Sequence, residues 1–284
     1  MKREKSGFTM VELLTVLAVI TILVGLLIPA LAMVRKIAKE TQQKAQLTTI
    51  GLAIMAFKVD YGDYPPSGAK DAADLDYSGA QKLAEALLGW DLMGFHPDSD
   101  FRSDGEDGSG NVIYPDPLDP IADIDNLNER RELYLEAGTA NAFKLEELFN
   151  SVPRLEPETF VLCDVFGVRR ITVSQGETIK AGTPILYYRA NTSSKDHIVT
   201  TSFNERIYNV FDNRYLVDLD TVTIDGTVGE EHPLGDSSNN YEAFYEYITD
   251  PKVAVPWPHR PDSYILITAG ADGKYGTRDD ICNF

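Results

Sequence analysis

The longest hydrophobic stretch of the chain lies close to its N-terminus. From Leu13 to Val34 there are 22 consecutive uncharged residues, dominated by Leu, Val, Ile and Ala, with Glu12 before them and Arg35 after them. At a rise of about 1.5 Å per residue, a helix of this length spans the roughly 30 Å hydrocarbon core of a bilayer. The pattern predicts a membrane-spanning helix. Basic residues flank it on both sides, so the positive-inside rule does not decide its orientation.

A helical period continues beyond this apolar stretch. Apolar residues recur at steps of three and four, which places them on one face of a helix: Leu47, Ile50, Ile54, Phe57 and Tyr61. A turn-forming run, Tyr61-Gly62-Asp63-Tyr64-Pro65-Pro66, then ends the pattern. We therefore expect one helix from about residue 8 to about residue 59, whose second half packs an apolar stripe against the rest of the protein.

The remainder of the chain changes from helical to strand patterns. Helical spacing predicts helices at residues 79–95, 126–136 and 143–149, with an exposed loop rich in Asp, Gly, Ser and Pro at residues 97–120. Runs rich in Val, Ile, Tyr and Thr predict strands at residues 159–168, 170–174, 184–190, 214–224 and 263–268. Helices followed by strands indicate an α+β body with an antiparallel sheet.

The charge is distributed unevenly between the N-terminal segment and the body. The whole chain of 284 residues has a net charge of −18, but residues 1–40 carry +3 and residues 41–284 carry −21. An acidic surface repels phosphate groups, so we expect no nucleic acid among the partners, whereas cations such as Ca²⁺ suit it. Two cysteines exclude a disulfide scaffold and a Cys₄ zinc site.

Two ordinary interpretations of the N-terminal segment compete with a specialised one. A secretory signal peptide could be cleaved after Ala32, and a plain signal anchor would keep the whole segment. Against cleavage, the apolar stretch is longer than the roughly 7–15 residues of an ordinary signal peptide. Neither interpretation explains why the carboxylate of Glu12 lies at the edge of a membrane helix, where a charge is costly.

The junction before the helix resembles the processing site of type IV prepilins and type II secretion pseudopilins. A short basic leader ends in Gly7, Phe8 follows, and a glutamate, Glu12, lies five residues after the cut. Pro29 in the apolar segment also fits this family. The resemblance covers roughly residues 1–66 and 250–284, so the chain is closest to a major pseudopilin with an enlarged middle region.

This resemblance implies a pilin-like fold and an assembly pathway. A prepilin peptidase would cut between Gly7 and Phe8 and methylate the new amine of Phe8, and Glu12 would pair with the N-terminus of a neighbouring subunit. Residues 1–7 would then be the leader, 8–34 the transmembrane and assembly helix, 35–60 its soluble half, and 61–284 the body. The implied partners are membrane lipid before assembly, an inner-membrane assembly platform, and identical or related subunits. The chain would cross the inner membrane once, with its body in the periplasm or otherwise outside the cytoplasm.

The C-terminal segment contains a second candidate site. A strand pattern leads into a glycine-rich loop, residues 268–281, that carries Asp272, Asp279 and Asp280. Calcium prefers six to eight oxygen ligands, which carboxylates on a sharply turning backbone supply. The loop resembles the calcium loop of major pseudopilins, which would make these three aspartates its side-chain ligands. The alternative is a simple turn with solvated carboxylates.

The remaining chemistry-bearing residues suggest no reaction. Asp98–Asp107 departs from the EF-hand template, the four histidines are scattered, and no hydrolase or nucleotide-binding motif occurs. Cys163 and Cys282 are either joined in a disulfide or present as two buried free thiols, and their spacing in the sequence does not distinguish these alternatives. We therefore expect a structural pseudopilin and no enzyme. A type IV pilin is the nearest alternative, and a secreted or membrane-anchored hydrolase is the alternative from another class.

Overall fold

The computed structural model describes residues 9–69, 75–115, 122–172, 176–198, 202–219 and 232–284. The chain divides into two compact units, of which the first ends at Gln42 and the second comprises Gln43–Phe284. Helix α1 (Met10–Tyr61) contributes residues to both. Its ends agree to within two residues with the helix expected from the sequence.

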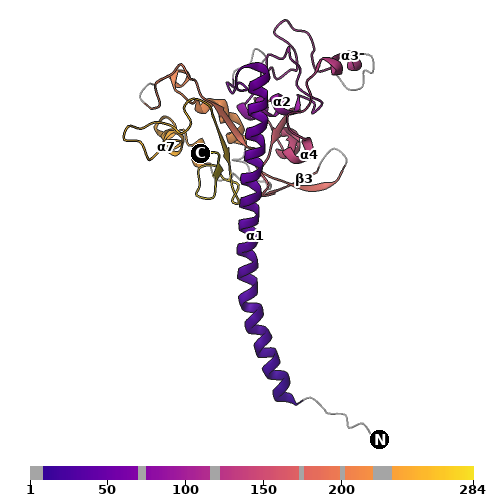
Figure 1. Ribbon diagram of the computed structural model, residues 1–284, viewed down its shortest axis with the longest axis vertical. Coiled ribbons are helices and arrows are strands. Elements are labelled where there is room, and N and C mark those ends of the chain that lie inside the picture. The colour runs from indigo at the N-terminus through magenta and orange to yellow at the C-terminus, as the bar shows by residue number, and fades with distance from the viewer. Residues whose placement is uncertain (1–8, 70–74, 116–121, 173–175, 199–201, 220–231) are drawn as a thin grey trace. The chain divides into compact units, whose positions relative to one another are not determined.

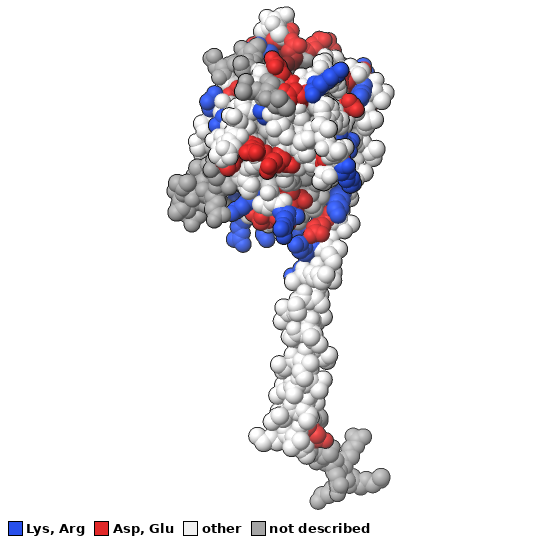
Figure 2. All heavy atoms as spheres, turned by 90° about the vertical axis from the view of Figure 1, so that its left-hand side faces the viewer, with Lys and Arg blue, Asp and Glu red and all other residues white. Residues whose placement is uncertain are grey.

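The first unit presents an uncovered apolar helix surface. The side chains from Leu13 to Val34 are exposed, and α1 continues through Pro29 without a break. Among the described residues, α1 is the one helix long and apolar enough to cross a membrane, with a mean hydropathy of 2.8 over its most apolar window. Figure 2 shows this surface as uncharged, with an acidic group near its N-terminal end. Length and composition are therefore consistent with a membrane anchor.

In the second unit, the predicted apolar stripe of α1 is buried. Leu47, Ile50, Ile54 and Phe57 are at most 4% exposed, and Tyr61 stacks on Phe57 with ring centroids 4.6 Å apart. In the hydrophobic core they pack with residues of α2 (Gly79–Leu88) and of strands of the body. Figure 1 shows α2 and these strands beside the C-terminal half of α1. The expectation that this half of the helix contributes to the core is confirmed.

Two buried glutamines add polar contacts to the same face of α1. The Nε2 atom of Gln46 donates to the carbonyl of Cys163 at 2.9 Å, and the Oε1 atom of Gln43 accepts from the backbone N–H of Val165 at 2.9 Å. Both side chains are buried. Because a buried amide without partners is costly, these bonds fix the register of α1 on the body.

The strands form three small antiparallel sheets rather than one. The first pairs β1 (Ala142–Lys144) with β2 (Phe160–Leu162), the second pairs β3 (Arg169–Thr172) with β4 (Thr178–Ala181), and the third has the order β5 (Leu186–Arg189), β6 (Tyr264–Thr268), β7 (Ile281–Cys282). The antiparallel α+β class is confirmed, whereas β1, β4 and β7 lie outside the expected strands, and β1 overlaps the helix expected at residues 143–149.

The three-stranded sheet separates two hydrophobic clusters. Because side chains alternate along a strand, Tyr187 of β5 and Leu266 of β6 join the cluster that contains the α1 stripe. Their neighbours Tyr188, Ile265 and Ile267 belong to the cluster on the other side, together with residues of α6 and α7. The sheet therefore holds α1 on one face and most of the enlarged middle region on the other.

Helix α2 (Gly79–Leu88) is shorter than the expected helix at 79–95. It begins with a capping box in which Ser78 and Gln81 exchange hydrogen bonds, and it ends before Gly89. Gly89 has a φ of 86°, and a Cβ atom there would lie 2.2 Å from the carbonyl oxygen of Gly94. The chain must therefore turn at this glycine, and the apolar residues beyond it are not helical.

The other helices are short. They are α3 (Ala122–Glu129), α4 (Ala137–Ala140), α5 (Leu145–Leu148), α6 (Arg214–Asp218) and α7 (Glu242–Tyr247), with 3₁₀ turns at Phe203–Glu205, Val210–Asp212, Pro233–Gly235 and Ser238–Asn240. The strand expected at 214–224 is wrong over residues 214–218, and residues 220–224 lie outside the described part of the chain. Leu216 and Val217 are adjacent and both buried. In a strand with one exposed face, one of two adjacent side chains would point to solvent, whereas a short helix packed between other elements buries both.

Two carboxyl groups of the body are fully buried, and we expect them to make its stability fall as the pH rises. Desolvation raises the pKa of Glu85 and of Asp212 to about 7, from 4.5 and 3.8. The unfolded chain releases both protons near pH 4, whereas the folded body keeps them to about pH 7. The contribution of these two groups to the free energy of unfolding should therefore decrease between about pH 4.5 and pH 7, by an amount on the order of 3 kcal/mol for each group.

Urea denaturation of the full chain at about pH 5 and about pH 7.5 measures this difference. The Glu85→Gln variant should have a flatter dependence on pH, while Glu246→Gln, at an exposed position of α7, should behave like the wild type. A Glu85→Gln variant with the same dependence on pH as the wild type would contradict the expectation.

Candidate functional site

The first turn of α1 is closed by a capping box. Thr9 precedes the helix, and its Oγ1 accepts from the backbone N–H of Glu12 at 3.3 Å. In return, the carboxylate of Glu12 accepts from the backbone N–H of Thr9 at 2.9 Å and from its hydroxyl at 2.7 Å. The sequence signal for this cap is a threonine three residues before a glutamate. Apolar spacing and the processing motif do not by themselves reveal this signal. The cleavage and methylation residues Gly7 and Phe8 lie outside the described residues.

Within the part of the chain that the structure describes, Glu12 is a charge without a compensating partner at the end of an apolar surface. Among the described residues its carboxylate accepts hydrogen bonds from Thr9 alone and has no ion-pair partner. Its neighbours Met10, Val11, Leu13 and Leu14 are apolar, and each is more than half exposed. In a membrane or a helix bundle, such a carboxylate requires a cation.

The comparisons with known proteins identify this N-terminal segment. Residues 2–28 match the family model described as the prokaryotic N-terminal methylation motif. This match supports a type IV pilin-like protein, and the motif implies processing by a prepilin peptidase and assembly of the subunits into filaments. No curated protein and no solved structure matches the chain.

The C-terminal aspartate loop follows β6 and turns at glycines. Gly270 has a φ of 65°, and a Cβ atom there would lie 2.4 Å from the carbonyl oxygen of Asp279. This close approach brings the two ends of the loop together and directs the Asp279 carboxylate toward the backbone after β6. The Oδ2 atom of Asp279 accepts from the N–H groups of Ala271 (2.7 Å) and Asp272 (3.0 Å). These bonds and that from the Thr277 hydroxyl lower its pKa despite desolvation.

Asp280 lies deeper in the same loop. Its Oδ2 atom accepts from the N–H of Gly276 at 2.7 Å and from the hydroxyl of Tyr247 at 2.9 Å, and its Oδ1 atom accepts from Thr277 at 3.1 Å. Burial raises the pKa of Asp280 to about 6 because desolvation outweighs these hydrogen bonds. The loop is therefore fastened to α7 through Tyr247.

The arrangement of the three predicted calcium ligands does not form a coordination shell. Asp279 and Asp280 both accept from Thr277, and the carboxyl group of Asp272, which accepts from the N–H of Lys274 at 2.8 Å, lies within hydrogen-bond reach of Asp279. Within the described part of the chain, no three His, Cys, Asp or Glu side chains are grouped as a metal site requires. N–H and O–H donors already occupy part of the acceptor capacity of Asp279 and Asp280. The calcium assignment stays a prediction.

Calcium should raise the melting temperature of the protein if this assignment is right. At about 100 times its Kd, a ligand stabilises the folded state by about 2.7 kcal/mol, which is about 5–10 °C for a body of this size. The measurement is a thermal melt of the full chain with chelator and then with excess calcium. Asp272→Ala should abolish the calcium-dependent difference and leave the melt in chelator nearly unchanged, because this side chain is exposed and its hydrogen bonds lie within the loop. Identical curves for the wild type in chelator and calcium would refute the site.

The structure contains Cys163 and Cys282 as free thiols rather than as a disulfide. Cys163 pairs with Pro184 just before β5, and Cys282 lies in β7, on the far side of β6. With strands about 4.8 Å apart, three steps separate the two residues by about 14 Å, whereas a disulfide needs Cα atoms less than about 7 Å apart. Of the two alternatives left open by the sequence, the structure has the free thiols.

Proposed function

We propose that this protein is a structural pseudopilin of a type II secretion system, which polymerises through α1 after a prepilin peptidase has cut between Gly7 and Phe8. The observation that carries the proposal is the methylation motif at residues 2–28, directly at the start of an apolar helix whose described side chains from Leu13 to Val34 are exposed. The proposal gives the protein a mechanical function and no catalytic one.

The exposed helix surface explains why such a chain would assemble. The apolar side chains between Leu13 and Val34 require either lipid or other helices around them, and before assembly lipid fills this role. In a filament, neighbouring helices would replace lipid, with packing of side chains as the driving force. A subunit that joins would bring the amine of its Phe8 to the Glu12 carboxylate of its neighbour, so that neither charge is buried alone.

The aspartate loop is the feature that favours a pseudopilin over a type IV pilin. Asp272, Asp279 and Asp280 have the spacing of the calcium loop in major pseudopilins, and the loop closes the sheet that supports α1. The body also docks α1 on an antiparallel sheet, an arrangement that both kinds of subunit would share. We therefore retain the type IV pilin as the second candidate.

Deletion of the gene in the source bacterium distinguishes the two candidates. A pseudopilin predicts that folded exoproteins accumulate in the periplasm while surface pili remain, and that a plasmid copy restores secretion. A type IV pilin predicts the reverse, with loss of surface filaments and normal secretion. Loss of neither, in a strain that normally makes the protein, would exclude both.

A further inference from the structure

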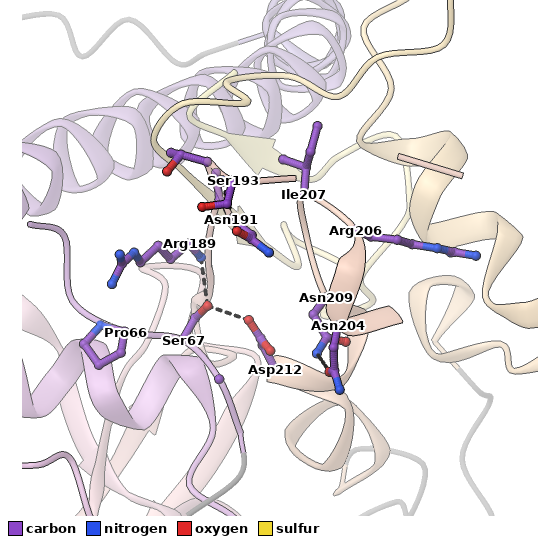
Figure 3. A pocket seen from close by; sticks show the side chains of 13 residues that line it. Pro66, Ser67, Arg189, Asn191, Ser193, Asn204, Arg206, Ile207, Asn209 and Asp212 are labelled. Atoms are coloured by element: carbon purple, nitrogen blue, oxygen red, sulfur yellow. Dashed lines mark hydrogen bonds between the residues drawn. The ribbon is translucent and has the colours of Figure 1, made fainter. Parts of the chain in front are cut away.

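A polar pocket of about 330 Å³ lies in the second unit, formed by none of the residues assigned to assembly or to calcium. Three segments line it: residues 66–68 after α1, residues 189–193 at the end of β5, and residues 204–212 (Figure 3). Its volume falls in the range of small-molecule sites, about 300–1,000 Å³.

Asp212 provides a buried acceptor in the wall of this pocket. Its side chain is 4% exposed, and its Oδ2 atom accepts from the hydroxyl of Ser67 at 2.5 Å. Ser67 itself accepts from the backbone N–H of Arg189 at 3.0 Å. Among the described residues no basic side chain lies within ion-pair distance of Asp212, and one hydrogen bond uses only part of the acceptor capacity of a carboxyl group. Figure 3 shows the carboxyl group of Asp212 facing Ser67, with Asn204 on its other side.

Neutral side chains with both donors and acceptors surround the opening. The Nδ2 atom of Asn209 donates to the Oδ1 atom of Asn204 at 2.9 Å, which leaves the amide nitrogen of the exposed Asn204 at the rim. Asn191 and Ser193 lie opposite, at the end of β5. The pocket thus combines a buried acceptor with donors around its opening.

The basic residues of the lining are already engaged elsewhere. The guanidinium of Arg189 pairs with Asp63 and donates to the carbonyl of Tyr64 at 3.3 Å. The guanidinium of Arg206 lies over the ring of Tyr245, 4.1 Å from its centroid, and points away from the pocket in Figure 3. An anionic ligand would face the carboxyl group of Asp212, and Lys82, whose charge acts on Asp212, already donates to the carbonyl of Gly68 at 2.6 Å.

Two further ligand classes fit poorly. No aromatic ring is among the described lining residues, so a nucleobase would have nothing to stack on. An extended peptide cannot add to β5 at Arg189, because the backbone N–H of this residue is already bonded to Ser67. A compact ligand with several hydroxyl groups matches the combination of a buried acceptor at Asp212 and neutral donors and acceptors at the rim.

We propose that this pocket binds a single pyranose, either free or at the end of a glycan. Hydroxyl groups of the sugar would donate to Asp212 and accept from the amide of Asn204, while Pro66 and Ile207 would contact the C–H groups of the ring. This site does not depend on the proposed function, and its failure would leave the assembly account unchanged.

Saturation-transfer NMR on the full chain in lipid nanodiscs tests the proposal. Nanodiscs are needed because glucoside and maltoside detergents would themselves supply sugar head groups. The probes are glucose, galactose, mannose and N-acetylglucosamine, and short oligosaccharides that end in each. We expect saturation of at least one pyranose. If a monosaccharide and the oligosaccharide that ends in it both bind, a free sugar is sufficient for binding. If the oligosaccharide alone binds, the ligand is the end of a glycan.

Variants connect the signal to the pocket. Asn204→Ala removes an exposed amide and should weaken binding about tenfold, as should Asp212→Asn, which preserves the side-chain volume. Asn128→Ala, at an exposed position of α3 outside the pocket, should bind like the wild type. Absence of saturation for every pyranose, or an unchanged affinity in both pocket variants when each is folded, would overturn the proposal.

Discussion

Replacing Glu12 with glutamine is expected to abolish filament assembly while leaving the start of α1 folded. Glutamine at this position still completes the capping box with Thr9, but it cannot pair with the charged amine of a neighbouring subunit. Loss of one partner from a buried ion pair costs about 3–5 kcal/mol, which is at least about 100-fold in the affinity of a subunit for the filament end. The measurement is the amount of sheared or overexpressed filament, compared at equal amounts of processed subunit.

Thr9→Val is the matched control. It removes the capping hydroxyl and preserves the Glu12 charge, so it should cost about 1 kcal/mol at the helix end and leave assembly intact. If Glu12→Gln assembled normally while Thr9→Val did not, the capping role of Glu12 would be the important one and the charge-pairing account would be wrong.

Ile50→Ala is expected to destabilise the body more than a change at any exposed site of α1. Ile50 is completely buried between α1 and the sheet, and deletion of such a side chain costs about 2–5 kcal/mol. This is a large part of the roughly 5–15 kcal/mol by which a domain is stable. Chemical denaturation of the full chain, followed by circular dichroism, measures the loss.

Leu52 provides the comparison on the same helix. Its side chain is 67% exposed, so Leu52→Ala should change the free energy of unfolding by less than about 0.5 kcal/mol. Equal losses for Ile50→Ala and Leu52→Ala would show that the stripe does not hold α1 on the body.

The long helix is predictable because its hydrophobic pattern is strong and continuous. The spacing of the stripe from Leu47 to Phe57 is enough to identify the buried face of α1. The same pattern misses Gln43 and Gln46, because a buried glutamine is explained only by partners more than 90 residues away in the sequence. Apolar spacing finds a core face, whereas polar anchors depend on tertiary contacts.

The errors in the body have similar causes. Residues 79–95 have helical spacing throughout, but the close contact between Gly89 and Gly94 ends α2 early. Residues 214–218 are rich in strand-forming residues, yet packing makes them helical. Strand β7 has only two residues, and it exists because it pairs with β6. Short elements take their structure from their neighbours, which local sequence does not specify.

The candidate sites differ in how much the sequence determines. The assembly site is local, since Gly7, Phe8 and Glu12 lie within six residues, and the family model matches this segment. The calcium loop is also close in sequence, but the direction of each carboxylate depends on hydrogen bonds such as that from Tyr247 to Asp280. The polar pocket joins three distant segments, and no motif in the sequence indicates it.

Mass spectrometry of the mature N-terminus, on protein isolated from a bacterium that has a prepilin peptidase, tests the central claim most directly. The account predicts a chain that begins with N-methylated Phe8 and lacks residues 1–7. A mature chain that begins at Met33 would identify a secreted protein with a cleaved signal peptide. One that retains Met1 would identify a simple membrane anchor, and either result would contradict the assembly function proposed for α1.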